Sequence, residues 1–531
     1  MQNRAYGIET EYSIAVKARH GGLYTGGLTG EPFGNPSRLL FDLFDHRELW
    51  NESLNELCLY PQKSTWQTYF LGSNGGKLYF DNTYTFPEYA TSECESIRGA
   101  LINSLAGDTV VEDMRKQAMR DGSLVRTYQG EATDIYIVRI NTSFRNDTPR
   151  DGSTTGCHEN YLVSKAIGDY DSDGSCEKLK KINGFMEFMV PFLMTRQIFD
   201  GAGGIHWNEE KSIWEFVLSQ RTFFTRAKTS TAAAGDGRGF LGFKRDESGS
   251  PYGATRLQVH SGDVPMSPFG KYIAMIATHL VVRAAEEGER QWRNYAPNDC
   301  WKGEFRELAR DVTLRSLITL ENGKRQRHYR ATEVQRLYAD FVINSIRIFS
   351  ADEQRMFAEW TAALDRLDRG FEEVVREYDW AIKYVFFRTA FGGNISSAKA
   401  RFSNFLYHDI SERGIYNRLL KRGAVLCFAS FDEIRNARMN PPPTRAEFRS
   451  RLIKALMRRK DNQTIQFPRD WGYFIGPTRS TAIPDPLERT NEAAENVLKN
   501  VEEHGVKKIP PNTPPASVDP EADFILPQEW E

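Results

Sequence analysis

The chain has 531 residues, 40% of them apolar and 26% charged, which is an ordinary globular composition and enough length for a large domain and a smaller one. The formal net charge of −2 gives no whole-molecule attraction to nucleic acid or to an anionic membrane. No stretch approaches the ~18 consecutive apolar residues of a membrane helix. The six cysteines are scattered without a Cys-x-x-Cys pair, which indicates reduced thiols. We therefore expect a cytoplasmic protein whose partners are neither nucleic acid nor membrane.

The first predicted element is a strand over residues 4–16. Apolar side chains alternate there with small or acidic ones, so Gly7, Glu9 and Glu11 share one face. Residues 20–36 are rich in glycine and are predicted to form a mobile loop. The strand therefore presents one apolar face and one acidic face.

Further elements follow the loop. Leucine spacing predicts a helix at 37–58, and a second strand over 77–82 places Lys77, Tyr79 and Asp81 on one face. The remaining predicted elements are helices at 97–120, 184–199 and 271–287, strands at 134–141, 213–219, 255–260 and 425–428, a mostly helical stretch from 329 to 390, and a basic helix at 445–460 capped by Thr444.

Changes of pattern along the chain predict its division into parts. Residues 1–423 form a large domain, in which residues 17–72 are a mobile insertion. Residues 424–500 form a small second domain, and residues 501–531, rich in proline and acid, form a flexible tail. The mixture of antiparallel strands with segregated helices predicts an α+β fold.

Carboxylates gather on and after the two predicted strands. Glu9 and Glu11 point the same way and would lie ~6.5–7 Å apart from the strand rise. A divalent cation that prefers hard oxygen ligands, such as Mg²⁺, would relieve their repulsion. Asp81 repeats the arrangement on the second strand, and Glu88 and Glu93 follow it. The pattern favours a sheet that holds metal and phosphate over a hydrated acidic face without a ligand.

Other polar residues are candidates of a more general kind. His158 begins a strand after a glycine, where a histidine is either structural or a substrate contact. Arginine forks suit phosphate and carboxylate, and Arg196, Arg221, Arg245 and Arg256 are spread over the middle of the chain. The sequence has no Walker loop, no G-x-S-x-G elbow and no zinc-like spacing of cysteine and histidine. Phosphate must therefore be bound by some other arrangement.

Several ordered motifs resemble one known family. They are GIETEY at 7–12, NGGKLYFD at 74–81, PEYATSEC at 87–94, GCHENYL at 156–162, PFLMTRQ at 191–197, LSQR at 218–221 and YHDI at 407–410, followed by Arg445 and DW at 470–471. On these motifs the chain is identified as a member of the family of Pup ligases (PafA) and depupylases (Dop), which is related to glutamine synthetase-type carboxylate-amine ligases. The resemblance implies a large glutamine synthetase-like domain, with a curved antiparallel sheet cradle packed against helices. It also implies that the small C-terminal domain contributes to the nucleotide site.

The resemblance assigns expected roles to individual residues. Glu9, Tyr79 and Glu88 match the family's magnesium ligands, and Asp81 matches its catalytic aspartate. The expected contacts of ATP are Lys77, Thr91, Trp471, Arg221 and Arg445. Further candidates close to this site are Glu11, Glu93, His158 and Arg245.

The implied activity depends on ATP and Mg²⁺. A Pup ligase phosphorylates the C-terminal glutamate side chain of a small disordered protein tag and joins it to a lysine of a substrate protein by an isopeptide bond. Asp81 would then take a proton from the lysine, whose ordinary pKa is ~10.4. A depupylase would instead hydrolyse a C-terminal glutamine amide or the isopeptide bond. Residues 90–94 and 156–158 resemble the ligases, whereas the long segment 17–72 resembles the depupylases; we predict a ligase.

The chain also departs from the family pattern. Lys77 stands where the family usually has arginine, and Ser248 where it has proline. Gln258 stands where a histidine is expected, although His260 lies two residues on. These departures keep two further readings open, namely a divergent carboxylate-amine ligase acting on another peptide and a binding protein with a degenerate site.

Overall fold

The structure is a computed structural model that carries side chains. It describes most of the chain between residues 3 and 504, with gaps. The described residues are 3–19, 21, 23–25, 40, 51–62, 68–80, 86–120, 122, 131–142, 154–165, 167, 176–230, 237–244, 253–288, 296–322, 325–458, 471, 473–475 and 480–504.

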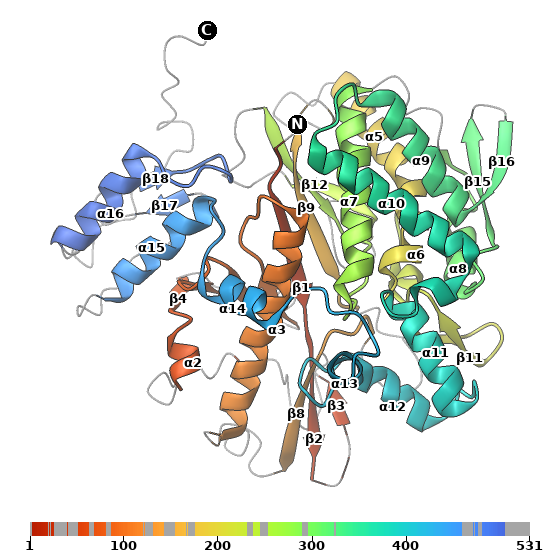
Figure 1. The fold of residues 1–531 in the computed structure, drawn as a ribbon, viewed down its shortest axis with the longest axis horizontal. Coiled ribbons are helices and arrows are strands. Elements are labelled where there is room, and N and C mark those ends of the chain that lie inside the picture. Colours follow the sequence, from red (N-terminus) through yellow and green to blue (C-terminus); the bar gives the residue numbers. More distant parts are fainter. Residues whose placement is uncertain are drawn as a thin grey trace.

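A large antiparallel sheet runs through the centre of the molecule (Figure 1). Its eight strands lie in the order β12 (Leu241–Lys244), β13 (Ala254–Val259), β9 (Cys157–Ser164), β1 (Tyr6–Glu11), β7 (Pro87–Ala90), β6 (Lys77–Phe80), β5 (Thr68–Leu71) and β4 (Leu59–Gln62). The strand β1 thus lies inside the sheet, paired with β9 on one side and with β7 on the other, and strands from later in the chain extend the sheet in both directions. β4 and β5 belong to this sheet although they lie within the predicted insertion 17–72.

The prediction of one continuous strand over residues 4–16 was wrong. The chain passes at Tyr12 from β1 into β2 (Ser13–Ala18), which belongs to a second sheet with β3 (Leu23–Thr25) and β8 (Ala132–Val138). Tyr12 is fully buried, and its hydroxyl donates to Asp108 at 2.8 Å. The alternation of apolar with small or polar residues continues through this break, so periodicity alone does not reveal that the partner strands change.

Helices cover one face of the central sheet. Ile8 and Tyr161 point into the main core together with residues of α3 (Ile97–Arg120) and α7 (Pro268–Glu287). Figure 1 shows α7, α9 and α10 on one side of the sheet. The other helices of this domain are α2 (Glu52–Asn55), α5 (Cys176–Thr195), α6 (Gln197–Asp200), α8 (Trp301–Arg310), α9 (Ala331–Ser345), α10 (Ala351–Arg369), α11 (Asp379–Phe391), α12 (Ala398–Tyr407) and α13 (Ile415–Lys421), with 3₁₀ turns at Arg221–Phe224 and Phe371–Val374.

Most other predicted elements are confirmed, but the strand predicted at 425–428 is not. The helix predicted at 97–120 is α3, and the stretch 329–390 contains α9 to α11. Residues 425–428 are irregular rather than a strand; they lead to Ser430, whose side chain caps α14 (Phe431–Met439) in a capping box with Glu433. The short apolar run there packs as a connector, which its composition does not distinguish from a strand. The remaining small sheets pair β10 (Gly204–Asn208) with β11 (Ile213–Val217) and join β14 (Ala296–Pro297), β15 (Leu317–Asn322) and β16 (Arg325–Arg330).

The C-terminal part forms a small unit at one end of the central sheet (Figure 1). It contains α15 (Arg445–Met457), the hairpin of β17 (Tyr473–Ile475) and β18 (Ser480–Ala482), and α16 (Glu492–His504). Thr444 caps α15 as predicted, since its side chain accepts a hydrogen bond from the Ala446 amide. The core of this unit includes Phe448 and Leu498 and extends to Phe70 of β5. The exact boundary of a second domain remains a prediction.

One glycine lets the small unit approach the sheet closely. Gly75 has a φ of +77°, and a Cβ there would lie 2.9 Å from the carbonyl oxygen of Ala446. The Gly75 carbonyl accepts a hydrogen bond from Nε of Arg449 at 2.8 Å. The turn before β6 thus rests directly on α15. The α+β class is confirmed, and among the described residues no helix is long and apolar enough to cross a membrane.

Candidate active site

The face of the central sheet opposite α3 and α7 carries the predicted site residues. Register explains why, because residues directly opposite each other in an antiparallel pair point to the same face. Glu9 lies opposite His158 on one side and Ala90 on the other. Glu88 lies opposite both Glu11 and Tyr79. Three carboxylates, a phenol and an imidazole therefore share a single face.

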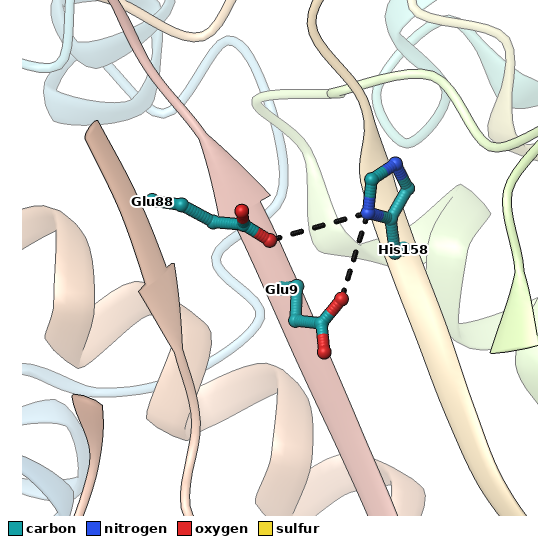
Figure 2. A group of neighbouring side chains, drawn as sticks. All are labelled: Glu9, Glu88 and His158. Carbon is teal, nitrogen blue, oxygen red and sulfur yellow. Dashed lines mark ion pairs between the residues drawn. The ribbon is translucent and has the colours of Figure 1, made fainter. Parts of the chain in front are cut away.

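Two of these carboxylates and the histidine form a compact cluster (Figure 2). Nδ1 of His158 lies 3.5 Å from Oε2 of Glu9 and 4.0 Å from Oε1 of Glu88. One nitrogen or oxygen atom from each residue lies within 4.8 Å of the other two. Oxygen atoms of paired carboxylates are the donor set that Mg²⁺ prefers. The residues at this position therefore fit the cation that the sequence implied.

Donors from β13 surround the Glu9 carboxylate. Nη1 of Arg256 donates to Oε1 of Glu9 at 3.1 Å, and Nε2 of Gln258 donates to Oε2 at 2.5 Å. The same Arg256 nitrogen also donates to Oδ1 of Asn160 at 2.9 Å. Glu9 is thus held by a separate donor on each oxygen, which fixes the plane of its carboxylate.

Arg221 contacts Nε2 of His158, the ring nitrogen that does not face Glu9 and Glu88. Its Nη2 lies 3.2 Å from Nε2 of His158, and its Nε donates to the carbonyl of His260 at 2.8 Å. A guanidinium can only donate, so Nε2 of His158 must accept and the ring proton must sit on Nδ1, the nitrogen that faces Glu9. His158 therefore presents an N–H to the carboxylates in this arrangement.

One nitrogen of the Arg221 guanidinium makes no hydrogen bond to the described residues. The residue is 1% exposed, and its Nη1 has no hydrogen-bond partner among the described residues. Burial lowers the pKa of its guanidinium, while the charges of Glu11 and Asp263 act in the opposite direction. A buried guanidinium nitrogen without a partner is costly, and an anionic ligand group would satisfy it. This fits the predicted contact of Arg221 with phosphate.

Two further residues of the polar face make hydrogen bonds: Tyr79 with Glu88, and Glu11 with the Gly156 amide. Burial and the charges of Glu88 and Glu9 raise the pKa of the Tyr79 hydroxyl well above its usual value. Tyr79 therefore remains a neutral phenol that hydrogen-bonds to Glu88. Glu11 accepts a hydrogen bond from the Gly156 amide at 2.5 Å, so it anchors the chain where β9 begins.

A pocket opens beside Glu9 at the end of the sheet. It holds about 630 Å³ of empty space, part of which is open to solvent. Its walls come from β1, β7, β9 and β13 and from the C-terminal unit, and they include Gly7, Glu9, Thr91, Arg445 and Trp471. The pocket thus brings β1 and the C-terminal unit together next to the carboxylate cluster.

Lys77 and Trp471 meet at the edge of this region. Nζ of Lys77 lies 4.5 Å from the ring centre of Tyr79, 5.8 Å from that of Trp471 and 5.9 Å from that of Phe70. A cation over aromatic rings is stabilised electrostatically, more so where water is excluded. Lys77 is therefore held on the polar face between β6 and the C-terminal unit.

Glu93 joins the C-terminal unit to the sheet. Its carboxylate accepts from Nε of Arg445 at 2.6 Å and from Nη2 of Arg449 at 2.5 Å. Burial alone would raise the pKa of Glu93, but the charges of Arg449 and Arg445 and their hydrogen bonds lower it to about 2. Glu93 and Arg445 thus build the pocket wall, and in this structure Arg445 is engaged with a carboxylate.

The structure assembles most of the predicted set. Glu9, Glu11, Tyr79, Glu88 and His158 lie together on the polar face, whereas Thr91, Lys77, Trp471, Glu93 and Arg445 border the neighbouring pocket or its wall. Asp81 and Arg245 lie outside the described residues, so their roles stay predictions. Arg196 is a core residue: its Nη2 donates to Glu159 at 2.6 Å and to Asp200 at 3.0 Å on the opposite face of the sheet.

Sequence reasoning missed three polar neighbours of the site. Gln258 was not singled out as a donor nor Asn160 as an acceptor, and Arg449 was not distinguished from the other basic residues of its helix. Asn160 and Gln258 lie opposite each other in the pairing of β9 with β13. The alternation of Arg256 with Gln258 was a usable signal, but only the pairing of β13 with β9 gives it meaning.

Comparison with known proteins identifies the family. A family model described as "Pup-ligase protein" matches residues 4–473. The curated Pup–protein ligase of Saccharomonospora viridis is 27% identical over 512 residues, which cover 94% of this chain and 100% of that protein. The chain therefore belongs to the Pup-ligase family, as its motifs indicated.

Solved structures share the fold. The Pup ligase PafA in its complex with Pup aligns with a TM-score of 0.71 at 22% identity, covering 95% of this chain and 93% of that one. PafA in complex with ADP aligns with a TM-score of 0.67 at 24% identity, covering 87% and 94%. The likeness extends over both the central sheet and nearly the whole of each chain.

Proposed function

We propose that this protein is an ATP-dependent Pup–protein ligase. It phosphorylates the C-terminal glutamate side chain of a small disordered Pup-like tag and joins that carboxyl group to a lysine of a substrate protein. Membership of the Pup-ligase family and the relatives' activity support this function. The scattered free cysteines of the described residues support a cytoplasmic location.

One structural observation carries the proposal. Glu9 belongs both to the cluster with Glu88 and His158 and to the wall of the pocket beside it. A phosphate chain that enters from the pocket would therefore reach the carboxylate cluster through Glu9. The PafA structures in complex with ADP and with Pup support a nucleotide and a tag as the ligands of such a site.

The residues implied to hold Mg²⁺ are Glu9, Glu88 and Tyr79. Bound Mg²⁺ would neutralise charge on the transferring phosphoryl group. Tyr79 contributes a neutral oxygen because its pKa is raised, and Glu88 accepts its hydrogen bond. Arg256 and Gln258 hold Glu9 in place. The donors of this face thus orient the carboxylates before the substrates arrive.

The reaction has two balanced steps. The γ-phosphoryl group passes from ATP to a side-chain oxygen of the tag's C-terminal glutamate, and ADP leaves. The lysine nitrogen then bonds to the acyl carbon as the carbon–oxygen bond to phosphate breaks, and inorganic phosphate leaves. Asp81 takes the proton of the attacking amine, since a protonated lysine is not a nucleophile. Arg221, whose Nη1 has no partner in the part of the chain that the structure describes, would stabilise charge on the phosphate.

A single assay tests this function. The protein is incubated with ATP, Mg²⁺, a Glu-ended tag and a lysine-bearing acceptor, with a Gln-ended tag as the parallel arm. Ligation gives one ADP and one phosphate for each tag added to the acceptor. Ammonia from the Gln-ended tag without ligation would instead establish the depupylase reaction. A protein that binds no nucleotide would be the binding protein with a degenerate site, and the proposal would fall.

A further inference from the structure

We propose that Gln258 is a positioning residue of the cation site: held by His260, it fixes the Glu9 carboxylate in the orientation in which that carboxylate binds a divalent cation. The inference rests on the proposed function only in taking Glu9 as a cation ligand. It concerns a position at which this chain carries glutamine where the family resemblance predicts histidine.

Gln258 bridges two residues of the site. Its Nε2 donates to Oε2 of Glu9 at 2.5 Å, and its Oε1 lies 2.8 Å from Nε2 of His260. Gln258 is 3% exposed and His260 is fully buried. Both side chains lie on the polar face of β13 and its continuation, because residues two apart in a strand point the same way. The three side chains thus form a buried chain of hydrogen bonds from His260 to Glu9.

The direction of each hydrogen bond in this chain is fixed. An ionised carboxylate only accepts, so the amide group of Gln258 must face Glu9. The Gln258 oxygen then faces His260, which must donate from Nε2. Rotating the amide by 180° would place its oxygen against the Glu9 carboxylate and its amide group against the His260 donor. The reversed amide would therefore make two unfavourable contacts, one with Glu9 and one with His260. The donor of His260 thus helps to fix the amide of Gln258 in a single orientation.

Gln258 and Arg256 hold different oxygens of Glu9. The Arg256 side chain is 20% exposed and also binds Asn160, so it is the more adaptable of the two donors. Gln258 is enclosed and has its remaining polar atom fixed by His260. Groups that hydrogen-bond to a metal-ligating carboxylate typically contribute ~10–100-fold to metal affinity. Gln258 is therefore expected to determine how well Glu9 is preorganised.

The test compares metal binding in five proteins. Mn²⁺ binding in the presence of ADP is measured by electron paramagnetic resonance for the wild type, Gln258→Leu, His260→Phe and the double variant. Gln335→Leu is the matched control, because Gln335 is an equally buried glutamine on α9 that binds Thr195 away from the site. Thermal unfolding of each protein shows whether it is folded.

We expect Mn²⁺ affinity to fall only in the variants of Gln258 and His260, and the two substitutions to be non-additive. Gln258→Leu weakens Mn²⁺ binding about tenfold or more, His260→Phe weakens it less, and the double variant resembles Gln258→Leu because His260 acts through Gln258. Gln335→Leu leaves Mn²⁺ affinity unchanged. Additive losses in the double variant, or a Gln258→Leu protein with wild-type affinity, would overturn the proposal.

Two further measurements keep the outcomes separate. If Gln258→Leu does not fold, Gln258→Asn takes its place, because it keeps the amide but ends one methylene short of Glu9; wild-type Mn²⁺ affinity in that variant overturns the proposal. A wild-type protein that binds Mn²⁺ with the expected pattern of variants but forms no isopeptide bond refutes the proposed function alone. A wild-type protein that binds no Mn²⁺ refutes the positioning role.

Discussion

The Arg221 guanidinium lies 3.2 Å from Nε2 of His158, and this contact decides which imidazole nitrogen faces the carboxylates. Because Arg221 cannot accept a hydrogen bond, His158 keeps its proton on Nδ1, 3.5 Å from Glu9 and 4.0 Å from Glu88. His158 could coordinate a cation through Nδ1 only if Arg221 withdrew. The geometry thus makes Glu9 and Glu88 the cation ligands and His158 a donor to them.

The first prediction concerns this tautomer. In the metal-free protein, ¹⁵N NMR of histidine-labelled samples should show His158 with a protonated Nδ1 and an unprotonated Nε2. The Arg221→Met variant replaces the donor by an apolar side chain of similar length, and the preference for that tautomer should weaken, because only the carboxylates then favour a proton on Nδ1. The His158→Gln variant identifies the resonance. A wild-type signal with the proton on Nε2 would contradict the assignment.

A second prediction separates ligands from donors. Glu88→Gln removes a charged oxygen ligand and should weaken Mn²⁺ binding about tenfold or more, measured by calorimetry with ADP present. His158→Gln keeps a group that can donate to the carboxylates and should weaken binding about threefold or less. If the two variants lose equal affinity, His158 is a direct ligand and the role given to Arg221 is wrong.

A third prediction concerns Lys77, which stands where the family usually has arginine. Lys77→Met removes the positive charge and should raise the Kd for ATP about tenfold, which corresponds to ~1.4 kcal/mol. Lys77→Arg keeps the charge and adds a fork that can bind phosphate bidentately, so ATP affinity should be retained or improved. Fluorescence titration with a labelled nucleotide measures both. Unchanged affinity in Lys77→Met would place the phosphates elsewhere.

A fourth prediction follows from the lowered pKa of Glu93. A carboxyl group whose pKa is about 2 in the folded protein, against an ordinary 4.5, stabilises the fold fully above about pH 5. That contribution, on the order of 3 kcal/mol, is lost as the pH falls from about 4.5 to about 2. The difference in unfolding free energy between wild type and Glu93→Gln should therefore shrink over this range. A difference that is constant from pH 6 to pH 3 would contradict the pairing with Arg445 and Arg449.

A fifth prediction separates binding from chemistry at Asp81. Asp81→Asn should retain the affinity for ATP and lose tag transfer to lysine, because the amide cannot take a proton from the attacking amine. Calorimetry measures the first quantity, and gel analysis of the conjugate measures the second. A variant that still conjugates at the wild-type rate would remove Asp81 from this role.

The sequence predicted the polar face of the sheet well because β-strand alternation is local. The shared face of Glu9 and Glu11, and that of Lys77 and Tyr79, follow from spacing alone. Alternation also means that neighbouring residues of one sequence motif can lie on opposite faces of the sheet. In the run of His158, Glu159 and Asn160, the first and third residues face the site, whereas Glu159 points to the other face and binds Lys271 at 3.2 Å.

The remaining features depend on contacts that are distant in sequence. Gln258 reaches Glu9 across 249 residues, and Arg449 reaches Glu93 across 356. Each residue alone resembles many polar residues on any protein surface. Only the strand order β13–β9–β1 and the docking of α15 on the turn at Gly75 give them a role, and neither follows from local pattern.

The link between Glu93 and Arg449 also bears on when the protein acquires activity during synthesis. The central strand β1 leaves the ribosome first, but Arg445 and Trp471, which line the pocket beside Glu9, are made after more than four-fifths of the described chain. A nascent chain can therefore hold its carboxylates on the sheet while it lacks the wall that retains a nucleotide. If the proposed function is correct, a chain that lacks the small C-terminal unit cannot attach a tag to neighbouring proteins. Activity would then begin only when translation of that unit is complete.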